Sequence, residues 1–116
     1  MLVAIAPNSL LLEVIGRITS QALCNQDMHL AGPFIYELVI HFRIACTINN
    51  NINESVALDP GFEAAAEQFL PVATRVASSV CSCLILRLDE RFIARLSDPT
   101  KQLRLSITLL NNVLTT

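Results

Sequence analysis

Residues 92–114, FIARLSDPTKQLRLSITLLNNVL, decide the fold class of this 116-residue chain. Apolar residues recur at helical spacing on both sides of the Asp98-Pro99 dipeptide. Such a dipeptide is typical of a turn that opens a helix, because Asp accepts hydrogen bonds from free amides and Pro suits the first helical position. The stretch therefore predicts two amphipathic helices joined by a turn, and an all-α protein.

The composition indicates more apolar surface than a domain of this size needs. Hydrophobic residues make up 53% and charged residues 16%, against roughly 45–50% and about 25% in an ordinary soluble domain. A chain of this length forms one domain, residues 1–116, with a high surface-to-volume ratio. We therefore expect a fragment or subunit of a larger assembly. In that assembly a partner, a second copy or neighbouring repeats would cover the excess apolar surface.

A first helix is predicted from a cap at Asn8 or Ser9 to the neighbourhood of Asn25. Glu13 and Arg17 are spaced for an i, i+4 ion pair. Gly16 lies in the middle of this helix, where glycine costs about 1 kcal/mol relative to alanine. Its position predicts the close approach of another helix.

A second helix is predicted to begin at Pro33. It is apolar on nearly every side, which is typical of a helix packed between layers or at an interface. We expect it to be the central element, with Ile40 and Ile44 as candidate partner contacts. The asparagine-rich stretch of residues 47–55, after this helix, predicts a surface loop.

A third helix is predicted to open at Asp59-Pro60-Gly61, and Pro71 is expected to kink or split it. Beyond Pro71, one helix runs to Ser97 or a turn interrupts it near Asp89. The last helix carries one apolar face at Leu103, Ile107, Leu110 and Leu114, and an adjoining one at Leu105, Leu109 and Val113. The count is about five helices.

The C-terminal pattern resembles a HEAT or armadillo-type helical repeat. The matching residues are Leu96-Ser97-Asp98-Pro99, Leu103-Arg104, Ser106 and Leu109-Leu110-Asn111-Asn112-Val113-Leu114. The resemblance implies that Asp98 caps a helix beginning at Pro99 and that Asp98 and Arg104 pair between neighbouring repeats. The 39-residue spacing of Asp59-Pro60 and Asp98-Pro99 lies within the period of such repeats. The expected fold is a HEAT- or armadillo-like stack of helical hairpins, with a compact four- to five-helix bundle as the alternative.

The four cysteines are expected to be reduced. Residues 1–6 are apolar without a basic segment before them, so no signal peptide is predicted, and we expect an intracellular protein, cytoplasmic or nuclear. Cys81 and Cys83 lie about 200° apart on a helix and face opposite sides. No metal set or cofactor is predicted. The longest uncharged apolar run, residues 76–86, has 11 residues, too few for a membrane span of about 20.

Charge is divided unevenly along the chain. Residues 1–74 carry two arginines and seven acids, a net −5, whereas residues 75–116 carry six basic and three acidic residues, a net +3. The halves are expected to attract one another within a chain or between copies. The overall charge of −2 does not favour nucleic-acid binding. Arg87, Arg91 and Arg95 form a stripe, interpreted as a solvated face or a contact for an acidic partner.

No catalytic motif is present in the sequence, so we expect no enzyme. We expect a protein-interaction or scaffold module that binds a partner or itself through apolar helix faces with an arginine-flanked edge. The candidate contacts are Arg87, Arg91, Arg95, Ile40, Ile44, Leu105, Leu109, Leu110 and Val113. The alternatives are a subunit of an obligate homo-oligomer and a small helical enzyme whose pocket is lined by Glu13, Arg17, Glu37, Arg43 and Arg87.

Overall fold

The computed structural model describes residues 7–54, 60–84 and 99–115. These residues form four α-helices: α1 (Ser9–Cys24), α2 (Met28–Asn53), α3 (Pro60–Leu84) and α5 (Pro99–Leu114). Within these ranges there is no strand. The all-α class is therefore confirmed, and the arrangement fits the four- to five-helix bundle alternative.

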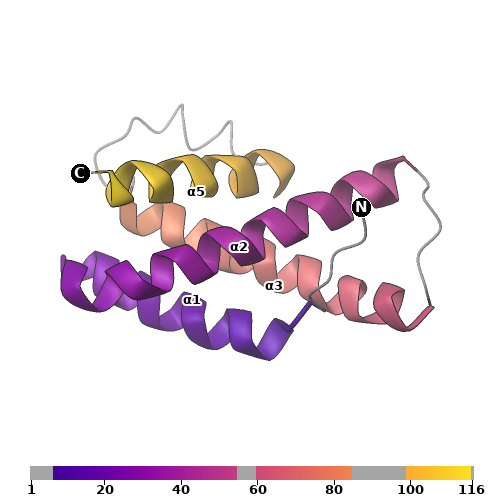
Figure 1. Ribbon diagram of the computed structural model, residues 1–116, viewed down its shortest axis with the longest axis horizontal. Helices are drawn as coiled ribbons and strands as arrows, with labels where there is room; N and C mark the ends of the chain where they lie inside the picture. Colours follow the sequence, from indigo (N-terminus) through magenta and orange to yellow (C-terminus); the bar gives the residue numbers. More distant parts are fainter. Residues whose placement is uncertain (1–6, 55–59, 85–98, 116) are drawn as a thin grey trace.

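The helices are arranged around the pair α2 and α3. These two pack against each other and against both α1 and α5, and α1 and α5 lie on opposite sides of the pair (Figure 1). Helix α2 runs opposite to α1, α3 and α5 (Figure 1). The prediction of a central second helix is confirmed: its fully buried side chains include Ile35, Leu38, Phe42, Ala45 and Ile48.

The start of α1 follows from its cap. The side chain of Asn8 accepts a hydrogen bond from the Leu11 amide at 3.0 Å, which satisfies one of the free donors of the first turn. Asn25 closes the helix, and Gln26 takes a φ of 59° in the tight turn before α2. Both predicted ends of this helix are confirmed.

Helix α2 begins at Met28, five residues before the predicted start at Pro33. Asp27 caps it by accepting from the Leu30 amide at 3.2 Å, and the added turn buries Ala31 completely. Pro33 leaves the carbonyl of His29 without its helical donor, but both residues are exposed and water can bond that carbonyl. The Asp27 cap and the burial of Ala31 therefore set the start of α2 at Met28, and Pro33 does not.

The predicted loop of residues 47–55 is also wrong where the structure describes it, because α2 continues through Asn53. Ile48 is fully buried in these turns, and Asn49 Nδ2 donates to Thr100 Oγ1 of α5 at 2.7 Å. Packing against α5 thus overrides the weak helix propensity of asparagine.

Helix α3 is continuous through Pro71, so the predicted split does not occur. Pro71 cannot donate to the carbonyl of Glu67, yet both residues face solvent. The predicted cap at Asp59, the turn near Asp89 and the helix before Ser97 lie outside the described residues. Pro99 is the first residue of α5, as predicted.

Candidate functional site

The candidate contacts on α2 separate into one exposed and one buried residue. Ile40 is 44% exposed, whereas Ile44 is 8% exposed and belongs to the core. The assignment of Ile44 to a partner surface is therefore wrong. A helix that is apolar on nearly every side does not reveal in its sequence which side its neighbours cover.

The candidates on α5 also differ in burial. Leu110 is fully buried, so its assignment as a partner contact is wrong, because it completes the face that packs on α2 and α3. Leu105, Leu109 and Val113 are half-buried, and Arg104 is exposed. The stripe of Arg87, Arg91 and Arg95, and the partner Asp98 implied for Arg104, lie outside the described residues.

Exposed large apolar side chains gather on the first two helices. In the described ranges, the large apolar side chains that are exposed to solvent all lie on α1 or α2. Those of α3 and α5 are half-buried or buried. We call this set the α1–α2 surface. Its members are Leu10, Leu11 and Val14 of α1, and Met28, Leu30, Tyr36, Ile40 and Ile52 of α2.

On α1 the exposed set follows from helical spacing. Leu10 and Val14 are one turn apart and 73% and 48% exposed, whereas Leu12 and Ile15 point to the core. Helix α1 is thus apolar on the face that packs and on part of the face that does not. On α2, Tyr36 and Ile40 are likewise one turn apart and both exposed.

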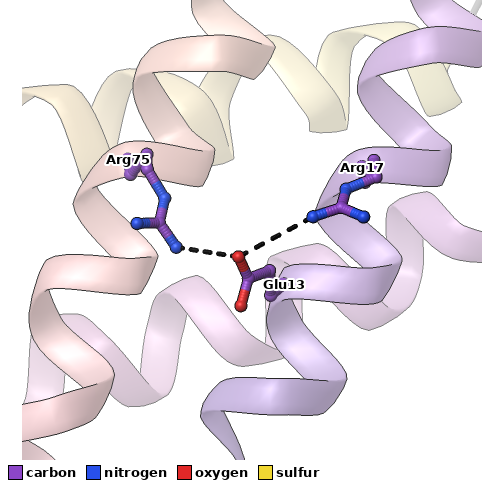
Figure 2. Close-up of polar contacts among 3 residues, drawn as sticks. All are labelled: Glu13, Arg17 and Arg75. Carbon is purple, nitrogen blue, oxygen red and sulfur yellow. Dashed lines mark hydrogen bonds and ion pairs between the residues drawn. The ribbon is translucent and has the colours of Figure 1, made fainter.

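Three charged residues cluster on the edge between α1 and α3. Glu13 Oε1 accepts from Arg75 Nη2 at 3.1 Å, and Arg17 Nη2 lies 3.9 Å from the same oxygen. Figure 2 shows both guanidinium groups turned toward the Glu13 carboxylate. The predicted Glu13–Arg17 pair is confirmed, and Arg75 supplies the expected attraction between the acidic and basic halves.

The charged residues proposed for a small enzyme do not line one pocket. Glu13, Arg17 and Arg75 border a shallow cleft of about 210 Å³, while Glu37 and Arg43 are exposed on α2 away from that cleft. Arg87 lies outside the described residues. The described part of the chain therefore gives this alternative no supporting geometry.

A second pocket, of about 850 Å³, lies between α3, α5 and the end of α2. Its wall is rich in hydroxyl and amide groups, with an apolar floor that includes Leu70 and Leu103. The hydroxyl groups are engaged: Thr74 donates to the Leu70 carbonyl and Ser82 to the Ser78 carbonyl, both at 2.9 Å. Thr74, Ser78 and Ser82 are spaced at i, i+4 and i+8 in the sequence, and this spacing indicates that they share one face of α3.

The cysteines are not all reduced. Cys24 at the end of α1 and Cys83 near the end of α3 form a disulfide, so the prediction is wrong for this pair. Cys46 and Cys81 are free thiols. The sequence could not reveal the bond, because it does not show that the ends of α1 and α3 meet.

Cys81 faces the other side of α3, as its helical offset from Cys83 predicts. Its Sγ lies 3.0 Å from the hydroxyl of Ser106 on α5. Burial raises the pKa of the Cys81 thiol above its ordinary value, and the Ser106 hydrogen bond opposes this shift in part. Burial also raises the pKa of the Cys46 thiol, opposed by the charge of Arg104. Both thiols therefore stay protonated near neutral pH.

Residues Met28–Ile52 of α2 are long and apolar enough to cross a membrane, although half of the most apolar window is buried against the other helices. A buried core helix has the same length and composition, so the absence of a span stays a prediction.

Among the described residues, no group of three or more His, Cys, Asp or Glu side chains is placed to hold a metal ion. No family model, curated protein or solved structure matches this chain.

Proposed function

We propose that this chain is a protein-interaction module whose α1–α2 surface packs against a second copy of the chain. The observation that carries the proposal is the confinement of exposed large apolar side chains to α1 and α2 in the described part of the chain. Large apolar side chains left exposed on two neighbouring helices of a small domain favour an interaction surface on those helices.

Tyr36 and Ile40 are the expected anchors of this contact. Tyr36 is 64% exposed and Ile40, one turn later, 44% exposed. A tyrosine presents a large apolar ring with a polar end, and for this reason tyrosine is enriched where interfaces bind most strongly. An isoleucine beside it adds area without a polar group to desolvate.

Charge supports a second copy as the occupant. Glu37 and Arg43 lie three residues before and after Ile40, and both are exposed. One acid and one base leave this part of α2 without net charge, so two copies do not repel each other there. The net charge of the whole chain, −2, adds little long-range repulsion.

The test is the solution mass of the purified chain, measured by sedimentation across a dilution series. We expect a dimer that dissociates on dilution, or one that persists if the oligomer is obligate. Ile40→Asp and Tyr36→Asp should each give a monomer, because they place a charge in the apolar contact. Ser78→Asp, an exposed site on α3, is the matched control and should leave the mass unchanged.

A wild-type chain that is monomeric at every concentration would overturn the proposal. An Ile40→Asp chain that dimerises as the wild type does would also overturn it, since the contact would then lie elsewhere. Circular dichroism of each variant checks that the helices are retained.

A further inference from the structure

One edge of the contact between α1 and α3 carries a row of small and polar groups, beside the buried apolar side chains that both helices contribute to the core. We call this row the α1–α3 seam. Its successive contacts join Glu13 to Arg75, Gly16 to Val76, Ser20 to Ser79 and Cys24 to Cys83. The contacts are three or four residues apart on α1, and their partners on α3 follow in the same order from Arg75 to Cys83, so the two helices run in parallel along the seam.

The non-covalent contacts of the seam are weak. The Glu13–Arg75 pair is solvent-exposed, and exposed ion pairs stabilise little. Ser79 donates to Ser20 at 3.2 Å, also on the surface, where water competes for both hydroxyls. Gly16 contributes no side chain. The disulfide is thus the strongest of the four seam contacts, beside the burial of Ala22 and Leu23 in the core.

The disulfide is also open to reagents. Cys24 is exposed and Cys83 is half-buried, so a thiol in solution can reach the bond. Cys81 does not compete for the pairing, because it is buried on the opposite side of α3 against Ser106. Cys83 Sγ lies 3.2 Å from the Ser20 carbonyl oxygen. Once reduced, this thiol therefore has a hydrogen-bond acceptor in place.

From these features we infer that Cys24 and Cys83 form a reversible redox clamp that fixes the end of α1 on α3 when oxidised and releases it when reduced. Closing the clamp removes one hydrogen from each thiol, and a disulfide oxidant such as glutathione disulfide takes up the two electrons and two protons to become two thiols. Reduction by two thiols runs the same exchange backwards. The inference is independent of the proposed dimer.

The test equilibrates the full chain in mixtures of reduced and oxidised glutathione, with alkylation and mass spectrometry to record each cysteine. We expect Cys24 and Cys83 to titrate together while Cys46 and Cys81 stay reduced. In the reduced chain, amides of residues 18–24 should exchange with deuterium at least about tenfold faster, and by a larger factor than the amides of α5. Reduction should lower the melting temperature by about 10 °C, since the bond closes a long loop.

The matched control is the double variant Cys24→Ser/Cys83→Ser, whose exchange and melting should not respond to the glutathione ratio. A Cys83 joined to any other cysteine would overturn the inference. Equal exchange of residues 18–24 in both states would also overturn it. An equal loss of protection in α5 and in α1 would do the same, because the bond would then stabilise only the whole fold and not one helix end.

Discussion

Helix α3 has a helix on each side, and the two neighbours are held by different means. On the α5 side the contact includes Leu103, Ser106 and Leu110, all at most 2% exposed. On the α1 side the α1–α3 seam brings the backbones close at Gly16 and adds an exposed ion pair, two serines and a disulfide. Burial of apolar side chains holds both helices in the core, and the α1 side adds a close backbone approach, exposed polar contacts and a covalent bond.

This comparison teaches that helix contacts in one small bundle can respond to different conditions. Salt screens an exposed ion pair and a thiol reductant cleaves a disulfide, whereas a buried apolar contact has neither a charge to screen nor a bond to reduce. The disulfide and the ion pair of the seam are therefore the contacts that reductant and salt can change, whereas the buried side chains of α1 and α5 keep the bundle folded. The next four experiments distinguish the α5 contact from the α1–α3 seam.

The largest effect is expected for Leu110→Asp on the α5 side. The new carboxylate would lie in a fully buried position without a partner, and an unpaired buried charge costs several kcal/mol. We expect the helical circular dichroism signal to be lost or the chain to aggregate. Thr108→Asp, exposed on the same helix, should melt as the wild type does. A stably folded Leu110→Asp chain would contradict the account of α5.

The next effect separates two glycines. A Cβ at Gly16 would lie 2.5 Å from Val76 Cγ1, whereas a Cβ at Gly32 would meet no atom within 4 Å apart from its chain neighbours and the nearby backbone of α2. Gly16→Ala should therefore destabilise the fold by about 1–3 kcal/mol, and Gly32→Ala should change its stability by less, because the gain in helix propensity is opposed by contact of the new Cβ with the ring of Pro33. Urea unfolding measures both. A cost of Gly16→Ala no larger than that of Gly32→Ala would mean that α1 and α3 do not meet closely.

A smaller effect is expected for the exposed ion pair of the seam. Arg75→Ala should cost less than about 1 kcal/mol, and the cost should shrink at high salt, because both partners are solvent-exposed. Lys101→Ala, exposed on α5, is a control for the loss of a charge. A large, salt-independent loss for Arg75→Ala would indicate that the pair is more buried than the structure shows.

The smallest effect concerns alkaline pH. Burial raises the pKa of the Cys81 thiol, so above about pH 8.5 the unfolded chain releases this proton before the folded chain does. The contribution of Cys81 to stability is therefore complete below this range and is lost as the pH rises through the folded pKa. Cys81→Ala should lose less stability between about pH 8 and pH 10 than the wild type in urea unfolding. An identical pH dependence would contradict the assignment.

Local signals in the sequence predicted several of these features. Asn8 as a cap, Pro99 as a helix start, the Glu13–Arg17 pair and the close approach at Gly16 each depend on a few neighbouring residues. The central place of α2 followed from its composition. In each case the decisive interaction lies within one helix or is marked by one unusual residue.

The remaining features depend on contacts between helices. Helix α2 continues to Asn53 because Ile48 and Asn49 pack on other elements, and no local signal reports that. Ile40 is exposed and Ile44 buried because of where the neighbours of α2 lie. The Cys24–Cys83 bond requires the parallel register of α1 and α3. Propensity and spacing do not contain this information.

The most direct test of the seam is a double-mutant cycle on Gly16 and Val76, measured by urea unfolding. Val76→Ala alone removes methyl groups from a nearly buried site and should destabilise the fold. In the Gly16→Ala background the same change removes the clash, so the double variant should be more stable than the sum of the single effects predicts, by about 1 kcal/mol or more. Additive effects would show that Gly16 and Val76 are not in contact and would contradict the close packing of α1 on α3.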